Sequence, residues 1–241
     1  MNAMIYAAGL GTRLKPLTEN KPKALIEVQG VTLIERAITK LAKSGFDRII
    51  INVHHHAKQL INFLNNNTFS AQIIISNESS ELLDTGGGLK NAESFFNKNE
   101  AFLVYNVDVI SDIDLRKMYN YHISSGAIAT LAVRNRNTSR YLLFDEKNNL
   151  TGWENIKTGE QKISRETKDK LSRKAFSGIH VISPKIFDLM TKTGNFSMID
   201  NYLELARTQI IKSFIHDDTF WMDIGKIENL EMINKLDKIP E

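Results

Sequence analysis

Two glycines and two basic residues near the amino terminus have the types and spacing of a phosphate-binding loop. Gly9 and Gly11 follow a short apolar run, and Arg13 and Lys23 come shortly after them. Glycines let the backbone turn tightly and direct its N–H groups at an anion. Arginine holds phosphate oxygens through a two-pronged fork, whereas lysine acts as a compact point charge. The pattern predicts a grip on a nucleoside triphosphate; the simpler alternative is a glycine turn beside solvated basic side chains.

Two better-known glycine motifs do not fit this loop. A dinucleotide-binding fingerprint requires a third glycine at the start of a helix, but Leu14 stands there and Pro16 disfavours a continuous helix. A P-loop requires Gly-Lys-Ser or Gly-Lys-Thr, and the chain has no such string. The loop therefore predicts a different class of nucleotide site.

Two carboxylates are candidate ligands for a metal ion. Asp108 follows the apolar stretch 102–104, and Asp223 follows an aromatic pair. Open α/β sheets bind ligands outside the carboxyl ends of their strands, so we expect both side chains to converge near the glycine loop. Magnesium prefers one or two carboxylates together with phosphate oxygens and water. For an isolated aspartate, a turn or a helix cap is the competing interpretation.

Two further clusters need an interpretation. The run Asp84-Thr85-Gly86-Gly87-Gly88 precedes an amphipathic stretch, and its bare backbone suits close approach to a nucleobase or ribose. His54, His55 and His56 stand at a strand end, where adjacent side chains point to different faces and cannot all bind one ion. We interpret the histidines as a solvated loop.

The elements that must position these residues alternate between apolar runs and amphipathic stretches. This alternation predicts an α/β fold of the Rossmann-like kind, a mostly parallel sheet flanked by helices. The expected strands are 2–7, 48–53, 71–76, 101–105 and 128–133, and the expected helices are 31–44, 57–64 and 89–96.

The pattern changes after residue 134. Residues 141–153 predict a hairpin with its turn at 145–149, which suggests a small substrate-side β lobe. Residues 156–174 are polar, with seven basic and three acidic residues, and favour a solvated surface loop over a basic lid. We expect further strands at 175–182 and 210–215 and helices at 198–207 and 227–236. Trp153 and Trp221 can either stack on a sugar or pack in the core.

The composition narrows the class of protein. The chain has 241 residues, 42% of them hydrophobic, which suits a single domain. Cysteine is absent, which excludes thiolate zinc sites and cysteine nucleophiles. The net charge of +3 does not call for a nucleic-acid partner. No apolar run approaches a membrane span or a leader peptide, so we expect a cytoplasmic protein.

The motifs together resemble the sugar-1-phosphate nucleotidyltransferases, whose pattern is approximately G-x-G-T-R-x-x-P-L-T followed by x-P-K-x-L. The matching residues are Gly9, Gly11, Thr12, Arg13, Pro16, Leu17, Thr18, Pro22, Lys23 and Leu25. Four later segments look most like the N-acetylmuramate-1-phosphate uridylyltransferases: 84–88, 106–108, 176–179 and 221–225. The resemblance implies the nucleotide-diphospho-sugar transferase fold and a place in peptidoglycan recycling. It also implies that the single domain consists of a nucleotide-binding core at 1–134 and a sugar-binding part with the carboxyl-terminal helices at 135–241.

The resemblance also assigns roles to residues. It implies catalytic roles for Arg13, Lys23, Asp108 and Asp223, the two aspartates holding Mg²⁺. It implies nucleotide contacts from Ala8, Gly9, Gly11, Thr12, Arg13, Lys23, Asp84, Gly86 and Gly87, and sugar contacts from Asn106, Glu154, Ser177 and Gly178. One departure is Val107, which stands where family members commonly have glycine before the metal-binding aspartate, and which adds bulk beside the metal.

The implied reaction transfers a nucleoside monophosphate from an NTP, UTP by resemblance, to a sugar 1-phosphate, by resemblance N-acetylmuramate 1-phosphate. A sugar phosphate is already a charged oxygen nucleophile, so the protein must mainly bring two polyanions together and stabilise the developing charge. Guanylyl, cytidylyl or thymidylyl transfer to another sugar phosphate or to phosphocholine is the nearest alternative. A non-catalytic nucleotide-sugar-binding regulator on the same scaffold is the alternative of a different class.

Overall fold

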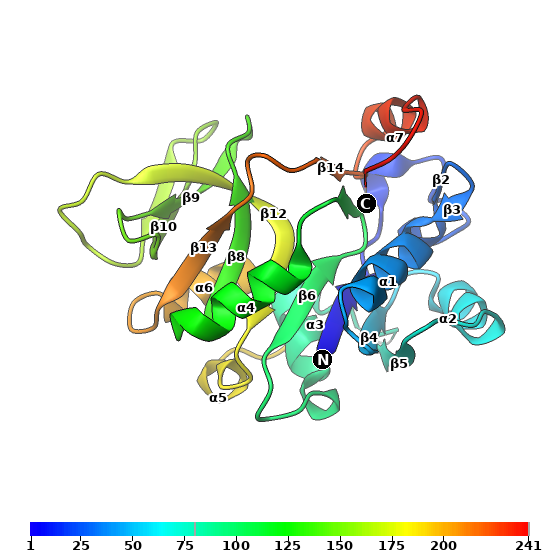
Figure 1. Cartoon of the computed structure of the whole chain (residues 1–241), viewed down its shortest axis with the longest axis horizontal. Coiled ribbons are helices and arrows are strands. Elements are labelled where there is room, and N and C mark those ends of the chain that lie inside the picture. The colour runs from blue at the N-terminus through cyan, green and yellow to red at the C-terminus, as the bar shows by residue number, and fades with distance from the viewer. Residues whose placement is uncertain (80, 241) are drawn as a thin grey trace.

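The computed structural model describes residues 1–79 and 81–240, and within them a ten-stranded mixed sheet forms the centre of the molecule (Figure 1). Its strands are β1 (Asn2–Tyr6), β4 (Arg48–Val53), β5 (Gln72–Asn77), β6 (Phe102–Asn106), β8 (Ala129–Arg134), β9 (Arg140–Phe144), β10 (Leu150–Asn155), β11 (Glu160–Ile163), β12 (Ser172–Ile182) and β13 (Ile211–Ile215). The longest path through the sheet is β11-β10-β9-β12-β6-β1-β4-β5, and β8 pairs with both β12 and β13.

The first part of the chain forms the parallel half of the sheet, β6-β1-β4-β5. Met4 on β1 lies opposite Ile50 on one side and Val104 on the other. The strands β1, β4 and β6 are almost wholly buried, because helices cover both faces of a parallel sheet. The predicted parallel core and its strand positions are confirmed.

The second part of the chain adds mainly antiparallel pairs, with β12 running antiparallel to β6, β8 and β9. The predicted hairpin is confirmed: β9 and β10 pair antiparallel around a turn in which Asp145 accepts hydrogen bonds from the backbone N–H groups of Lys147 and Asn149. The prediction of a loop over 156–174 is wrong in part, because β11 pairs with β10 there. The side chains of β11 are nevertheless exposed, as expected of a solvated segment.

The helices are α1 (Leu33–Lys43), α2 (Ala57–Asn66), α3 (Asp84–Asn91), α4 (Leu115–Ser125), α5 (Ile186–Leu189), α6 (Met198–Leu205) and α7 (Ile227–Asn234), with short 3-10 turns at Thr12–Leu14, Lys23–Leu25 and Glu93–Phe95. The predicted helices near 31–44, 57–64, 198–207 and 227–236 are confirmed, whereas α4 and α5 were not predicted from the sequence. Thr32 and Glu35 form a capping box at the start of α1. The bounds predicted for the helix over 89–96 are wrong. The helix found there, α3, begins five residues earlier and ends at Asn91.

Two small ribbons lie outside the main sheet, and neither was predicted from the sequence. The strands β2 (Glu27–Val28) and β3 (Val31–Thr32) form one hairpin, and β7 (Val109–Ser111) pairs with β14 (Trp221–Asp223) in the other. The second ribbon joins segments more than a hundred residues apart and, as shown below, builds the site.

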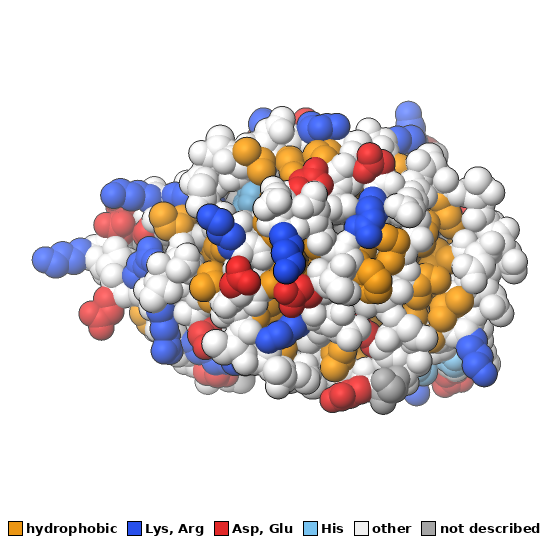
Figure 2. Space-filling view, turned by 90° about the horizontal axis from the view of Figure 1, so that it is seen from below, with side chains coloured by type: hydrophobic (Ala, Val, Ile, Leu, Met, Phe, Trp, Pro, Cys, Tyr) orange, Lys and Arg blue, Asp and Glu red, His pale blue; other side chains and the backbone are white. Residues whose placement is uncertain are grey.

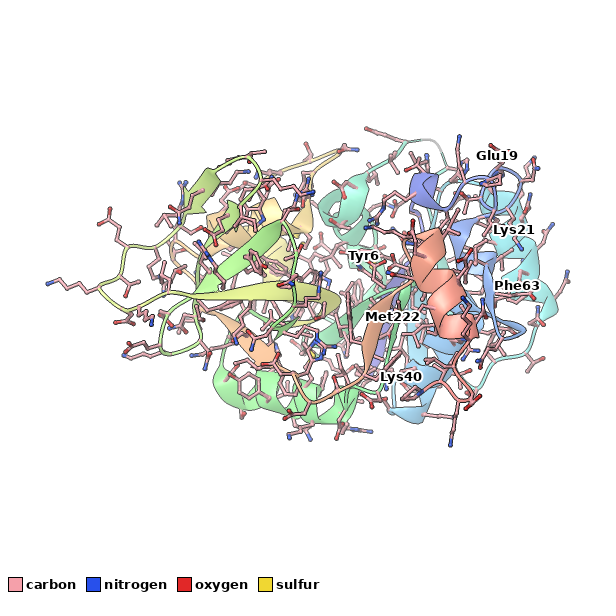
Figure 3. The ribbon with its side chains drawn as sticks, turned by 90° about the horizontal axis from the view of Figure 1, so that it is seen from above. Tyr6, Glu19, Lys21, Lys40, Phe63 and Met222 are labelled. Carbon is pink, nitrogen blue, oxygen red and sulfur yellow. The ribbon has the colours of Figure 1, made fainter. Side chains whose placement is uncertain are left out.

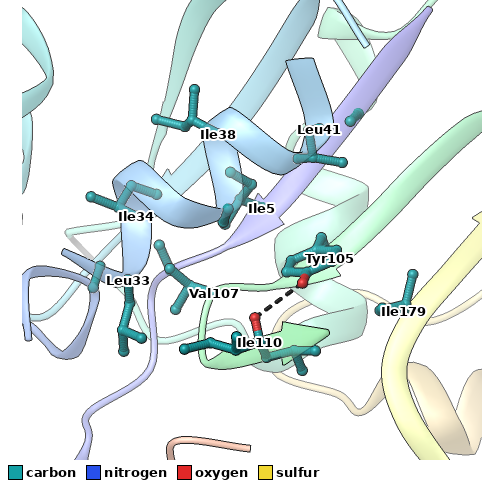
Figure 4. Packing of buried hydrophobic residues seen from close by; sticks show 14 of the residues in the cluster. Ile5, Leu33, Ile34, Ile38, Leu41, Tyr105, Val107, Ile110 and Ile179 are labelled. Atoms are coloured by element: carbon teal, nitrogen blue, oxygen red, sulfur yellow. Dashed lines mark hydrogen bonds between the residues drawn. The ribbon is translucent and has the colours of Figure 1, made fainter. Parts of the chain in front are cut away.

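The core consists of two apolar layers, one on each face of the sheet. Alternate residues of β1 point to opposite layers: Ala3 and Ile5 pack with α1, α2 and α4, while Met4 packs with α3, α5 and α6. Figure 1 shows α1 and α4 on the near face of the sheet and α3 and α6 behind it. Figure 4 shows Val107 in the first layer, beside Leu33 on α1.

The surface carries charges of both signs. On the face seen in Figure 2, basic and acidic side chains are interspersed among apolar ones. Among the described residues, no helix is long and apolar enough to span a membrane. The division of the chain at residue 134 into a nucleotide part and a sugar part stays a prediction.

Candidate active site

The glycine loop follows β1 directly and opens onto a cavity. Gly11 has a φ of +64°, and a Cβ there would lie 2.9 Å from the Thr18 Cγ2 atom. The Thr18 hydroxyl donates a hydrogen bond of 2.8 Å to the Gly11 carbonyl, which fixes this turn. A Cβ on Gly9, by contrast, would meet nothing within 4 Å. Gly11 is therefore required by the backbone, whereas Gly9 borders open space.

The cavity has a volume of about 330 Å³ and lies at the carboxyl ends of the parallel strands β1 and β6. Six of the predicted site residues line it: Ala8, Gly9, Lys23, Asp84, Asn106 and Asp108. Gly11, Thr12 and Arg13 follow on the same loop. Figure 3 places Tyr6, another residue of the cavity wall, near the middle of the molecule, with Glu19 and Lys21 at its outer edge.

Asn52 supports the loop, a role that sequence reasoning missed. Its side-chain oxygen accepts a buried hydrogen bond of 2.8 Å from the Ala7 N–H, and its Nδ2 donates to Glu78 at 3.1 Å. Burial raises the pKa of Glu78, a carboxyl that is almost fully covered. An asparagine inside the otherwise apolar strand β4 was the available signal.

The ribbon of β7 and β14 brings the two candidate metal ligands together. Asp223 lies opposite Val109, the residue after Asp108, and the Ile224 N–H donates a hydrogen bond of 2.8 Å to the Asp108 carbonyl. The Lys23 ammonium forms an ion pair with the Asp108 carboxylate, and their side chains are only 12% and 17% exposed. The predicted convergence of Asp108 and Asp223 near the glycine loop is therefore present in the structure, and Lys23 joins them there.

Asp223 lies in an environment suited to a cation. Burial and the neighbouring Asp108 carboxylate raise its pKa, while Lys23 and Arg13 act in the opposite direction. Its Oδ1 atom is buried and accepts no hydrogen bond from any described residue. A Cβ on Gly225 would collide with this atom and lie 2.8 Å from an Arg13 Nη atom, so glycine there lets Arg13 approach the carboxylate.

Asp108 and Asp223 are thus able to hold one divalent cation between them. In the described part of the chain, no group of three or more His, Asp or Glu side chains forms a complete ligand set. A cation at this position would take its other ligands from water or from substrate oxygens, the usual arrangement for Mg²⁺. The three histidines 54–56 lie elsewhere, and His54 and His56 contact the backbone carbonyls of Glu78 and Glu19.

The glycine run lies inside α3 instead of preceding the helix, which corrects the prediction made from the sequence. A Cβ on Gly86 would collide with the Phe196 ring, and one on Gly87 with the Gly194 carbonyl. Both glycines therefore allow α3 to pack closely on residues 194–196. The cavity wall here is formed by Asp84 and Thr85, and contact of Gly86 and Gly87 with a base stays a prediction.

The residues predicted on the sugar side are arranged around β12. Gly178 has a φ of +76°, and a Cβ there would lie 2.9 Å from the Asn106 Nδ2 atom. Ser177 is fully buried: its hydroxyl contacts His216 Nε2 at 2.7 Å, and its carbonyl accepts a hydrogen bond of 2.9 Å from the Trp221 indole. The Ser177 carbonyl thus anchors Trp221 and the ribbon that carries Asp223, while the hydroxyl holds His216.

Glu154 is the outlying member of the predicted set. Its carboxylate is 9% exposed and forms an ion pair with Arg173 on the neighbouring strand β12. Its contact with a sugar stays a prediction, as do those of Asn106, Ser177 and Gly178.

Comparison with known proteins identifies the class to which this fold and site belong. A family model described as nucleotidyl transferase matches residues 2–238. The chain therefore belongs to the nucleotidyl transferase family.

Individual relatives differ in their substrates. The chain is 28% identical over 245 residues to a UTP–glucose-1-phosphate uridylyltransferase of Synechocystis, covering 94% of this chain and 61% of the relative. It is 39% identical over 111 residues to an N-acetylmuramate alpha-1-phosphate uridylyltransferase of Caulobacter vibrioides, covering 45% and 46% of the two chains. The chain thus spans about three-fifths of the first of these relatives.

A solved structure shows the same fold. The UDP-glucose pyrophosphorylase from Acinetobacter baumanii superposes with a TM-score of 0.81 at 18% identity, covering 99% of this chain and 95% of the other. The expected nucleotide-diphospho-sugar transferase fold is confirmed.

Proposed function

We propose that this protein transfers a nucleoside monophosphate from an NTP to a sugar 1-phosphate and releases pyrophosphate. The observation that carries the proposal is the cluster of Lys23, Asp108, Asp223 and Arg13 beside the cavity at the carboxyl ends of β1 and β6. Three half-buried charges of both signs beside the exposed Arg13 suit two polyanionic substrates that must meet.

The chemistry requires positioning more than proton transfer. A phosphate oxygen of the sugar attacks the α-phosphorus of the nucleotide, a new P–O bond forms, and the bond to the pyrophosphate breaks. The backbone of 8–11 and Arg13 hold the β- and γ-phosphates, while Lys23 accompanies the charge that develops at the α-phosphate. Because the nucleophile is already anionic, no general base is needed. We expect in-line attack with inversion at phosphorus.

Mg²⁺ is the cofactor that we propose, because the donor set of Asp108 and Asp223 fits a hard cation that retains several non-protein ligands. When bound, Mg²⁺ would neutralise phosphate charge in the transition state. The ion pair between Lys23 and Asp108 holds these two charged groups beside each other.

For the substrates we propose UTP and N-acetylmuramate 1-phosphate. The supporting comparison is the 39% identity over 111 residues to a relative of that name, although other relatives carry names with glucose or mannose 1-phosphate. A second cavity of about 550 Å³, lined by Tyr141, Trp153 and Arg140 among others, offers room for a substituted sugar. The reaction would then belong to the cytoplasm and to the reuse of cell-wall sugars.

The test is pyrophosphate release with Mg²⁺, the four ribonucleoside triphosphates and dTTP, against N-acetylmuramate, N-acetylglucosamine, glucose and mannose 1-phosphates and phosphocholine. We expect turnover only with both substrates, and its loss in Asp108→Asn. Asp47→Asn, which removes an exposed carboxylate, is the matched control. Nucleotide binding without turnover of any pair would contradict the proposal and favour a regulator.

A further inference from the structure

Arg136 lies where the antiparallel lobe meets the ribbon that carries Asp223. It follows β8, and its guanidinium carbon lies 4.7 Å from the centre of the Trp221 ring. Trp221 and Asp223 stand two residues apart on β14, so their side chains share one face of that strand. The guanidinium is therefore held against the ribbon that carries a candidate metal ligand.

The hydrogen bonds of Arg136 leave much of its donor capacity unused. One Nη atom donates to the Phe176 carbonyl at 3.1 Å, and the buried Nε donates to no described residue. The ion pairs found among the described residues do not include Arg136. A guanidinium has five N–H donors and prefers an anionic acceptor, so this half-buried charge lacks the partner for which its shape is suited.

The electrostatic environment of Arg136 suits the binding of an anion. Burial lowers the pKa of Arg136, and the Asp223 carboxylate opposes that shift. Arginine remains protonated at neutral pH under such shifts. The protein thus keeps a desolvated positive charge near the carboxylates of the site.

The positions of the two cavities indicate which substrate anion Arg136 is placed to bind. Arg136 lines the cavity of about 550 Å³ together with Tyr141 and Trp153. It does not line the cavity of about 330 Å³ beside the glycine loop. Asp84 borders both cavities. Arg13 and Lys23 supply positive charge on the glycine-loop side. Arg140 and Lys162 also line the larger cavity, but Arg136 is the one of its basic residues whose guanidinium stacks on Trp221 of the Asp223 ribbon.

We propose that Arg136 binds the phosphate of the sugar 1-phosphate and holds its attacking oxygen toward the α-phosphorus. This inference rests on the proposed transfer reaction. A planar guanidinium can hold two phosphate oxygens at once and so fixes the direction of the third. Stacking on Trp221, whose indole is anchored to the Ser177 carbonyl at 2.9 Å, fixes the plane of the guanidinium in advance.

The test compares steady-state kinetics of the whole protein and of Arg136→Gln in both directions of the reaction. We expect the KM for the sugar 1-phosphate to rise about 10- to 100-fold, the range for a lost charge-assisted hydrogen bond, with the KM values for UTP and pyrophosphate nearly unchanged. N-acetylmuramate and N-acetylglucosamine 1-phosphates should be affected alike, because both carry the phosphate. Arg136→Lys should recover part of the affinity.

Arg134→Gln is the matched control. Arg134 ends β8 two residues earlier, donates to the Thr219 carbonyl at 3.3 Å, and does not line the cavity. This variant should keep the wild-type KM values. Calorimetric titration of N-acetylmuramate 1-phosphate into the protein without nucleotide gives a second readout, and thermal melting shows whether each variant is folded.

Three results would overturn the inference. A loss confined to N-acetylmuramate 1-phosphate would show that Arg136 recognises the sugar's carboxylate, and a rise in the KM for UTP or pyrophosphate would place it on the triphosphate. Unchanged KM values with a lowered melting temperature would show a purely structural role. If the wild-type protein turns over no sugar phosphate, the proposed function itself fails, which is distinct from these outcomes.

Discussion

In the parallel half of the sheet, the cavity is bordered by the ion pair of Lys23 and Asp108 as well as by neutral side chains such as Asn52. In the antiparallel half, Glu154 also pairs with Arg173, but the buried histidines contact neutral hydroxyl groups. His180 contacts the Tyr202 hydroxyl, His216 contacts Ser177, and His122 contacts Thr130. The two halves therefore stabilise their polar side chains by different means.

The difference follows from the topology. Parallel strands end together, so short loops after β1 and β6 gather charged side chains at one edge, where water and substrates reach them. The antiparallel lobe is built by strand pairs that enclose side chains between β8, β12 and the helices packed on them. We therefore expect charge changes to affect chemistry in the first half and pH to affect stability in the second.

The largest effect should come from removing the lysine of the charged pair. Lys23→Met should lower kcat about 10²- to 10³-fold, because a positioned charge at the transition state is lost. The same change should strengthen the binding of Mn²⁺ in the absence of nucleotide, since Asp108 loses the ammonium with which it pairs. Water proton relaxation measures that binding directly.

Lys21→Met is the control for this change, because Lys21 lies at the outer edge of the molecule (Figure 3). It should change neither kcat nor Mn²⁺ affinity appreciably. Weaker Mn²⁺ binding in Lys23→Met would contradict the view that the lysine neutralises the carboxylates before substrates bind.

A smaller effect, on stability instead of chemistry, is expected at the junction of the two halves. Val107 is 5% exposed, packs beside Leu33 and Ile110 in Figure 4, and has no positive φ that would favour glycine. Val107→Gly should lower the free energy of unfolding by about 2–3 kcal/mol through lost burial and added chain entropy. Its kcat/KM should stay within about threefold of wild type.

Denaturant unfolding and steady-state kinetics measure the two quantities in parallel. A large gain in turnover without loss of stability would instead support the expectation from the sequence that the valine crowds the metal site. The buried packing of Val107 favours stability as its main role.

The nucleotide side could be predicted closely because its information is local. Gly11, Arg13 and Lys23 lie within fifteen residues of one another, and the strand before them is a plain apolar run. The same holds for the hairpin around Asp145, whose turn residues bond within the turn. Short-range chemistry of this kind is visible in the order of residue types.

The rest depended on contacts between distant segments. The strands β7 and β14 have three residues each, too few for a periodic signal, and only their pairing places Asp223 beside Asp108. The glycine run was predicted to precede the helix, but it lies inside α3. Glycine is needed there because α3 packs closely on Phe196, a contact that the local sequence does not reveal. Arg136 lies in a polar stretch that resembles an ordinary loop, and only Trp221, 85 residues later, shows what holds it.

The smallest expected effect concerns His216, which ties the antiparallel half to Ser177 behind the site. Burial lowers its pKa to about 4, below the usual 6.5. Between these values the unfolded chain binds a proton that the folded protein does not, so stability falls as the pH falls from 6.5 toward 4. For this one group the loss between pH 7.5 and pH 5 is about 2 kcal/mol.

His216→Gln removes that titration while keeping a donor and an acceptor for Ser177 and Thr219. Denaturant unfolding at pH 7.5 and pH 5 should therefore show a pH-dependent loss smaller by about 2 kcal/mol in the variant, with His122 and His180 supplying the part that remains. Equal pH dependence in both proteins would mean that His216 is not the group through which acid weakens this half of the molecule.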